Sequence, residues 1–324
     1  MTAPTITDLL DAGDLEVSLR DHLLRRYLPD VFLYLGREGA DHWLDLDGSA
    51  GFGVASSLTD LLRAEAPAVA SHVPGGTGLV SLGVGGGRKE RLLLETLPGN
   101  GHGPRRYLAT DVSRPLVESA LAAVADLPLV ACGATARLED LVRLRPLVDG
   151  PALVCLLGNT FSNFDPQRLL GRVRAGLGPS DLFLLDCRLG PRPEADEAAW
   201  REGVERVYGS AENARFNLGP LAARGLAADA GRFGLRVVRV PSRLGPTWRT
   251  RKRIEILRDA DLVFPGGPVR LRAGDVVRMG FTYKHTRRQV LGWVQAAGFD
   301  VVEAAAGAGG ANLLVLARAT RGSP

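Results

Sequence analysis

The middle of the chain, from Gly78 to Cys187, alternates short apolar runs with stretches whose apolar positions recur at helical spacing. Strands that are apolar along their whole length, separated by helices, predict a parallel sheet covered on both faces. The expected strands are Gly78–Val84, Tyr107–Asp111, Leu129–Cys132, Pro151–Leu157 and Asp181–Cys187. The expected helices are Lys89–Leu97, Arg114–Ala125, Leu138–Arg145 and Gln167–Gly176.

The pattern changes after Gly190, where Pro191 and Pro193 interrupt it. Two helical stretches and several β-rich runs follow, and their alternation is typical of antiparallel strands, so a second unit is expected here. Its expected elements are helices at Ala195–Tyr208 and Asn213–Ala228 and strands at Leu235–Val240, Thr247–Leu257, Val269–Leu271 and Asp275–Tyr283. The pattern then returns to that of the central region, with a helix at Thr286–Ala297 and strands at Phe299–Glu303 and Asn312–Arg318.

Composition narrows the classes of protein that remain. With 324 residues, 45% of them hydrophobic, the chain can bury the core of one large domain or two linked ones. It has neither an apolar run long enough for a membrane span nor a secretory pattern at its start, so we expect a cytoplasmic protein with no membrane partner. The three cysteines are widely spaced within apolar runs, which indicates buried thiols and no metal site.

The charge pattern argues against a nucleic-acid partner. The formal net charge is +4 and the pI is about 9.2, but acidic residues are interspersed with arginine along most of the chain. Arginine supplies nearly all of the positive charge, because lysine occurs only at Lys89, Lys252 and Lys284. We therefore expect a small-molecule ligand, and a monomer or a dimer.

A glycine-rich segment, Ser81-Leu-Gly-Val-Gly-Gly-Gly-Arg-Lys89, follows the first expected strand and opens a helix. Glycines at this place let the backbone approach a ligand and direct helix N-terminal amides at it. Asp111 ends the next strand, where a carboxylate can accept hydrogen bonds from ribose hydroxyls. Gly83, Gly85, Gly86, Lys89 and Asp111 are therefore candidate cofactor residues, and this pattern alone suits NAD, FAD or S-adenosylmethionine (SAM).

Two further strand ends complete the candidate cofactor site. The third strand ends in Cys132-Gly133-Ala-Thr135 without an acid, so backbone groups near Gly133, or Thr135, would have to hold an adenine ring. The fourth strand is followed by Gly158-Asn-Thr-Phe-Ser-Asn-Phe-Asp-Pro166, which places Asn159 and Asn163 beside the cofactor. A dehydrogenase would more often show a second nucleotide-binding half, which favours SAM over NAD.

These motifs together resemble the histidine-specific SAM-dependent methyltransferase family, known for methylating the α-amine of histidine in ergothioneine biosynthesis. The resemblance runs through most of the chain. It is based on the glycine loop, Asp111-Val-Ser113, the Asn163 segment, Phe216-Asn-Leu218, Arg253-Ile-Glu-Ile-Leu257, Gly274-Asp-Val-Val-Arg278 and Thr282-Tyr-Lys-His285. It implies SAM as cofactor, with Asp111 on the ribose, and it implies that Tyr34, Asn163, Phe216, Asn217 and Thr282 contact an amino acid acceptor.

The resemblance also implies an α/β fold in which a class I (Rossmann-like) sheet, closed by one antiparallel strand, carries a second, smaller α+β substrate domain. The expected division assigns residues 57–192 and 285–324 to the SAM-binding domain. Residues 1–56 and 193–284 would form the substrate-recognition domain.

The chain departs from the family where the histidine ring is held. The family's glutamate and serine correspond to Gly280 and Thr282, and Ser49-Ala-Gly-Phe-Gly53 occupies the region of its paired tyrosines. Histidine is therefore not the expected acceptor. An α-amine or a side-chain nitrogen such as the arginine guanidino group remains open, in a divergent enzyme of specialised metabolism. An NAD-dependent oxidoreductase and a non-catalytic SAM-binding protein are the alternatives.

Transfer of a methyl group to nitrogen requires a neutral nucleophile, so a protonated acceptor must first lose a proton. Asn163 and Tyr283 are the candidate catalytic residues, and His285 is either a base or a structural residue. Acids in the second unit could orient the acceptor; the candidates are Glu38, Asp41, Asp45, Asp47, Glu202, Glu205 and Glu212. Glu139 and Asp140 are expected at the surface of a helix.

Overall fold

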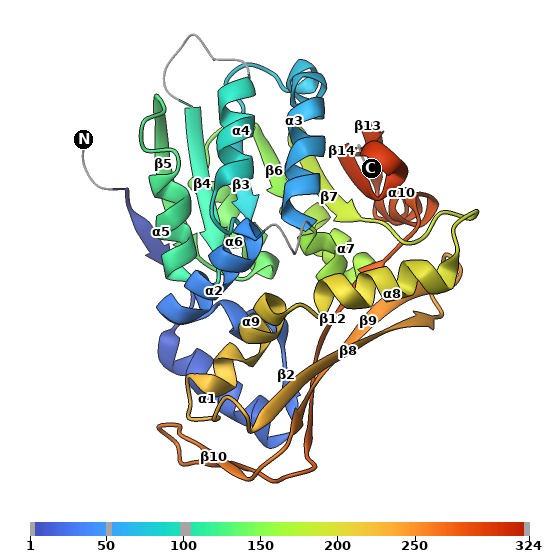
Figure 1. Ribbon diagram of the computed structural model, residues 1–324. Helices are drawn as coiled ribbons and strands as arrows, with labels where there is room; N and C mark the ends of the chain where they lie inside the picture. Colours follow the sequence, from blue (N-terminus) through green and yellow to red (C-terminus); the bar gives the residue numbers. More distant parts are fainter. Residues whose placement is uncertain (1–3, 50–53, 98–104, 321–324) are drawn as a thin grey trace.

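The structure, a computed structural model, describes residues 4–49, 54–97 and 105–320, and within them eight strands form one large sheet (Figure 1). The strand order is β1-β5-β4-β3-β6-β7-β14-β13. Neighbours from β1 to β7 are parallel, whereas β14 is antiparallel to both β7 and β13. The strands are β1 (Ile6–Asp8), β3 (Gly78–Leu82), β4 (Arg105–Asp111), β5 (Leu129–Thr135), β6 (Ala152–Leu156), β7 (Leu182–Arg188), β13 (Phe299–Ala306) and β14 (Asn312–Ala319). The parallel sheet with one antiparallel closing strand is confirmed.

Helices cover both faces of this sheet, each over its own apolar core. The first face carries α3 (Val54–His72), α4 (Arg88–Thr96) and α5 (Arg114–Ala122). The second carries α6 (Leu141–Leu144), α7 (Pro166–Gly176) and α10 (Arg287–Ala296). None of the helices in the described ranges is both long and apolar enough to cross a membrane.

A second unit lies below the large sheet in Figure 1 and has an apolar core of its own. Its four-stranded sheet has the order β2-β12-β9-β8, with β8, β9 and β12 antiparallel as expected. The strands of this sheet are β2 (Tyr27–Leu28), β8 (Gly231–Val240), β9 (Thr247–Ile256) and β12 (Val276–Lys284). A separate two-stranded sheet is formed by β10 (Ala260–Leu262) and β11 (Val269–Leu271). The helices are α1 (Ala12–Leu24), α2 (Gly36–Gly48), α8 (Glu197–Tyr208) and α9 (Ala211–Ala222).

The structure differs from the sequence-based expectation at the N-terminus. Ile6–Asp8 was assigned to the substrate domain, but it forms β1, an edge strand paired with β5 of the large sheet. Asp8 fixes the strand there, because its carboxylate accepts hydrogen bonds from Thr135 Oγ1 at 2.8 Å and Arg114 Nη2 at 2.5 Å. These partners lie more than a hundred residues away, so the local pattern does not reveal the pairing.

Two expected helices are shorter than predicted. Leu138–Arg145 forms only α6 between two 3-10 helices, and the second of these, Arg145–Leu147, contains Pro146, which lacks the amide that a continuing α-helix needs. Helix α9 ends at Ala222 rather than Ala228, and Gly225 adopts a φ of +102° in the turn that follows. This turn leads into β8, which begins at Gly231 and is longer than expected.

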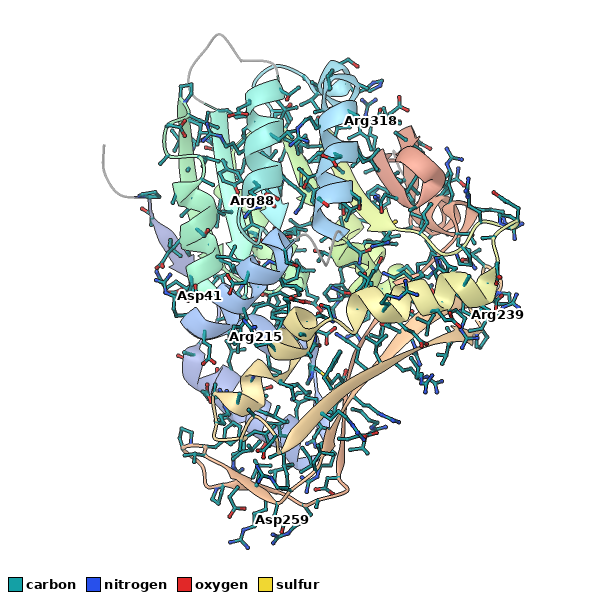
Figure 2. The ribbon with its side chains drawn as sticks, in the orientation of Figure 1. Asp41, Arg88, Arg215, Arg239, Asp259 and Arg318 are labelled. Atoms are coloured by element: carbon teal, nitrogen blue, oxygen red, sulfur yellow. The ribbon has the colours of Figure 1, made fainter. Side chains whose placement is uncertain are left out.

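Helix α2 connects the two units. It packs against α9 in the second unit and against α3 and α5 on the large sheet. Figure 2 shows α2 and α9, marked by Asp41 and Arg215, side by side under the helices of the large sheet. The ends of β3 and β4 therefore face a wall of side chains from the second unit.

Candidate active site

A cavity of about 390 Å³ lies between the carboxyl ends of the parallel strands and the second unit, a size typical of small-molecule sites. Eleven of the residues expected from the sequence line it: Tyr34, Gly83, Gly85, Gly86, Lys89, Asp111, Asn159, Asn163, Phe216, Asn217 and Thr282. The cavity thus joins the expected cofactor residues to the expected acceptor residues in one space.

The glycine loop has the backbone that its sequence predicts. Gly83, Gly85 and Gly87 have φ values of +71°, +57° and +78°, in the left-handed region that favours glycine. A Cβ at Gly85 would lie 3.1 Å from Trp43 Nε1 on α2, and one at Gly87 would lie 2.7 Å from Ala120 Cα on α5. The loop is therefore held tightly from both sides, and the amides of Gly83 and Val84 both donate hydrogen bonds to the Thr110 carbonyl at the end of β4.

Asp111 lies at the end of β4 beside this loop. Its carboxylate accepts hydrogen bonds from the backbone amides of Ser113 at 3.0 Å and Gly85 at 3.3 Å. Burial raises the pKa of Asp111 to about 6, against the lowering effect of these amides. A buried carboxylate that faces the cavity fits the two hydroxyls of a ribose, so the residues present suit a nucleoside-containing cofactor.

Lys89 and Asn159 shape the same end of the cavity. Lys89, in the first turn of α4, acts on the buried carboxylates of Glu90 and Asp186, whose pKa values burial raises and the lysine charge opposes. Asn159 has a φ of +65°, and its Oδ1 accepts hydrogen bonds from Ser162 Oγ and the Arg188 amide, both at 2.8 Å. These contacts hold the loop that carries Asn163.

Asn163 points across the cavity to the second unit. Thr282 Oγ1 of β12 donates a hydrogen bond of 2.9 Å to Asn163 Oδ1. The cap of α7 is supplied by Asp165, which accepts a hydrogen bond from the Arg168 amide at 2.9 Å. Asn163 is therefore not needed as a helix cap, and its side chain belongs to the cavity.

The acceptor end has an aromatic wall. The rings of Tyr34, Trp43 and Phe216 contact one another at centroid distances of 5.2 to 5.6 Å. Next to Phe216 on α9, Asn217 donates from Nδ2 to the Asn213 carbonyl at 2.7 Å, and its Oδ1 is buried without a hydrogen-bond partner. A ligand seated here meets flat apolar rings beside a small number of fixed polar atoms.

Gly280 faces an acid that the sequence did not single out. A Cβ at Gly280 would lie 2.5 Å from Cγ and Oδ1 of Asp30, so the Asp30 carboxyl group fills the place of a side chain. Asp30 Oδ2 accepts a hydrogen bond from Lys252 Nζ at 2.7 Å, and Asp30 Oδ1 is buried without a partner. Both residues line the cavity.

Two expected site residues do not line the cavity. Gly133 lies within β5, where a Cβ would be 2.4 Å from Val117 Cγ1, so its role is to let α5 pack closely on the sheet. Tyr283 stacks on His285 at 5.0 Å and is absent from the cavity wall. His285 bonds Thr247 Oγ1 at 3.0 Å, and burial lowers its pKa to about 4, which favours the structural interpretation.

The structure also revises the candidate acids and adds residues. Of the seven acids considered, only Asp47 lines the cavity, whereas Glu139, expected at a helix surface, does line it. Asp30, Lys252, Tyr208 and Asn213 were missed. A signal existed for Lys252, because it is one of only three lysines in an arginine-rich chain. Residues 50–53, in the segment where the family's tyrosines were sought, lie outside the described ranges.

The strand order, the antiparallel β14, the glycine loop after β3 and the acid after β4 define a class I SAM-dependent methyltransferase. The sequence profile of the family described as "histidine-specific methyltransferase, SAM-dependent" matches residues 14–319. The chain belongs to this family, and its cofactor is SAM. Both alternatives raised by the sequence, an oxidoreductase and a non-catalytic protein, are set aside by this finding.

Comparison with solved structures returns methyltransferases at low identity. A SAM-dependent methyltransferase from Clostridium acetobutylicum is 9% identical, with 82% of this chain and 92% of that chain covered and a TM-score of 0.42. A 1,6-didemethyltoxoflavin N1-methyltransferase from Burkholderia thailandensis is 14% identical, with 99% and 94% covered and a TM-score of 0.43. A sugar N-methyltransferase from a Streptoalloteichus species is 12% identical, with 82% and 88% covered and a TM-score of 0.40. A search of curated proteins gives no match.

Proposed function

We propose that the protein transfers the methyl group of SAM to a nitrogen of an amino-acid-like small molecule other than histidine, in specialised metabolism. The observation behind this proposal is the contact between Gly280 and Asp30. A side chain at position 280 would collide with the Asp30 carboxyl group, so the site has no room for the glutamate that the family resemblance predicts at this point. The polar group at this place is instead the Asp30 carboxylate, on the 3-10 helix Asp30–Tyr34.

The charges at the acceptor end support an amino-acid-like molecule. Asp30 and Lys252 place an anion and a cation side by side in the cavity wall. The unpartnered Asp30 Oδ1 can accept a hydrogen bond from an N–H group, and the Lys252 ammonium group can donate to a carboxylate. A zwitterion satisfies both, whereas an uncharged acceptor would leave the pair without additional partners.

Two kinds of nitrogen remain candidates for the methyl group. A guanidino group at Asn163 would place the α-ammonium and carboxylate at Asp30 and Lys252, whereas an α-amine at Asn163 would instead direct the side chain toward Asp30. Both arrangements use the aromatic wall of Tyr34, Trp43 and Phe216 for the apolar part of the acceptor.

The experiment is incubation of the purified protein with SAM and a pool of free amino acids and guanidino compounds, histidine included, followed by mass spectrometry. We expect a gain of one or more methyl groups on a compound other than histidine. Methylation of histidine alone would contradict the proposed specificity. No methylation of any compound, with SAM binding intact in calorimetry, would overturn the proposal.

The variant Asn163→Ala tests the acceptor site separately from the SAM site. It removes the amide that faces both Thr282 and the acceptor, while Asp111 and the glycine loop remain unchanged. We expect the KM for the acceptor to rise and kcat to fall while the Kd for SAM stays close to that of the wild type. Equal weakening of SAM binding and acceptor use would contradict the assigned role of Asn163.

A further inference from the structure

Lys284 is a fully buried lysine beside the cavity. It is 1% exposed, and its Nζ lies 2.8 Å from the hydroxyl oxygen of Tyr208 and 4.7 Å from the centre of the Tyr208 ring. Within the described part of the chain, no carboxylate forms an ion pair with Lys284. An ammonium group in such a place is costly to desolvate, so the lysine needs either a neutral form or an anionic partner.

The position of Lys284 on β12 links it to the acceptor site. Gly280 lies in a β-bulge between Arg278 and Phe281; beyond it side chains alternate, so Thr282 and Lys284 share one face of β12, and all three residues are buried. Of the three, Gly280 contacts Asp30, Thr282 bonds Asn163 and Lys284 bonds Tyr208. Tyr208 lines the cavity together with Asn163 and Thr282.

Neighbouring charges and burial act on the pKa values of both side chains. Burial lowers the pKa of Lys284, and the nearby Arg188 lowers it further, whereas Tyr208 raises it. Burial alone would raise the pKa of Tyr208, but Lys284, followed by Arg188 and Lys252, holds it below its ordinary value. Cys187 also faces Lys284. Both pKa values are lowered, and the 2.8 Å contact lets the two side chains share a single proton, with tyrosinate beside ammonium as the charge-paired form.

We propose that Tyr208, held by Lys284, accepts the proton that the acceptor nitrogen must lose before methylation. This inference rests on the proposed N-methyltransferase function, in which SAM supplies a methyl group on a positively charged sulfur. A protonated acceptor passes one N–H proton to the Tyr208 oxygen, which leaves phenol beside ammonium. The freed nitrogen lone pair forms the C–N bond as the C–S bond breaks with its electrons remaining on sulfur. The pair later returns the proton to water.

In this assignment Tyr208 is the catalytic residue, because it lines the cavity, and Lys284 is a positioning residue that acts through it. Removal of a general base typically slows a reaction about 10²- to 10⁴-fold. Lys284→Met keeps an unbranched side chain of similar length, and Tyr208 can then stay protonated, so that no unpaired charge is left buried. Tyr208→Phe removes only the hydroxyl group.

The first test needs no acceptor. The chain has five tyrosines, and a titration of tyrosinate ultraviolet absorbance in the SAM-bound protein should show one that ionises below the others. Tyr208→Phe should abolish this first step, and Lys284→Met should move it to higher pH. Tyr283→Phe is the matched control, which removes a tyrosine outside the cavity and should leave the step in place. If the titration curve of Tyr208→Phe differs from that of the wild type only by a smaller absorbance change at high pH, Tyr208 ionises together with the other tyrosines, and the assignment is overturned.

The second test uses the compound that the methylation pool identifies. Tyr208→Phe should lower kcat about 10²- to 10⁴-fold with KM for the acceptor changed far less. Lys284→Met should move the rising limb of the kcat–pH profile upward, which loss of packing alone would not do. An unchanged profile would contradict the assignment. If the low-pH tyrosinate step is present but no compound of the pool is methylated, the proposed function alone is overturned. If a compound is methylated but the low-pH step is missing, this inference alone is overturned.

Discussion

The carboxylate of Asp111 is buried beside the glycine loop before any ribose reaches it. Its pKa is raised to about 6, so in the folded protein this group retains its proton to higher pH than it does in the unfolded chain. Its ionisation therefore costs stability as pH rises toward 6. The hydroxyls of a ribose donate to the ionised form, so cofactor binding and ionisation favour each other.

We therefore expect the affinity for SAM to increase as pH rises to about 6 and to level off above it. The slope below this value should be at most about tenfold per pH unit, because a single proton is linked to binding. Calorimetry across this range measures the Kd directly. Asp111→Asn should bind SAM more weakly and without this pH dependence, and a wild-type Kd that is constant below pH 6 would contradict the role of Asp111.

A second prediction concerns Gly280. In Gly280→Ala the new methyl group would lie 2.5 Å from the Asp30 carboxyl group, which Lys252 holds in place. We expect a loss of about 1–3 kcal/mol in the free energy of unfolding, typical of overpacking, measured by urea denaturation.

Gly234→Ala is the matched control for this change. Gly234 is also a strand residue of the small sheet, on β8, but no heavy atom lies within 4 Å of a Cβ added there. Its substitution should alter stability by no more than about 0.5 kcal/mol. Equal stabilities of the two variants would mean that Asp30 does not fill the space above Gly280.

The site residues of the large sheet were the easiest to predict from the sequence, because strand ends and glycine turns have local sequence patterns. Asp111 and Gly83 were found in this way. Asp30 and Lys252 were not, since they are 222 positions apart and meet only after the second unit has folded. The same holds for Tyr208 and Lys284, which are 76 positions apart. The rarity of lysine was the available signal: Lys89 and Lys252 line the cavity, and Lys284 bonds a residue that does.

Among the elements, the segment between β6 and α7 has one residue that stabilises a helix and, two positions before it, one that faces the cavity. Asp165 caps α7, and Asn163 faces the cavity. Asp165→Ala should therefore lower stability by about 0.5–2 kcal/mol, the usual cost of a lost N-cap, with little change in kcat/KM for the acceptor. Thermal unfolding and methyl-transfer assays on the same preparations measure the two effects.

Asn163→Ala is the matched partner of this variant, and it should affect the acceptor more than the fold. The opposite assignment, in which Asn163 rather than Asp165 holds the helix, would exchange the two results. A variant of either residue that lost stability and acceptor use to the same degree would show that the segment acts as one unit.

The position of individual elements explains why the domain division from the sequence needed revision. The N-terminal segment enters the large sheet as β1, then builds α1, β2 and α2 of the second unit, and returns as α3. A continuous assignment of residues 1–56 to one unit misses this, because a three-residue edge strand has too short an apolar pattern to be recognised.

Considered as a whole, the molecule places its reaction in a space that neither unit encloses alone. The large sheet supplies the glycine loop and Asp111, and the second unit supplies Asp30, Lys252 and Tyr208. Helix α2 covers the glycine loop through Trp43 and Leu44 while it packs on α9. A shift of α2 would therefore move the side chains that contact the cofactor loop.

This arrangement predicts that the two units unfold together and that S-adenosylhomocysteine stabilises both. A ligand at 100 times its Kd adds about 2.7 kcal/mol to the free energy of unfolding. In Trp293→Phe the remaining tryptophans, Trp43, Trp200 and Trp248, all belong to the core of the second unit, so their fluorescence reports this unit. Circular dichroism reports the helices of both units. We expect the two midpoints to coincide and to rise together with the ligand.

The control is the same pair of measurements on Asp111→Asn, which should retain coincident midpoints but lose most of the shift caused by the ligand. Separate midpoints, with the ligand leaving the fluorescence transition unchanged, would mean that the second unit folds independently. In that case the contact of α2 with the glycine loop would not couple the two units.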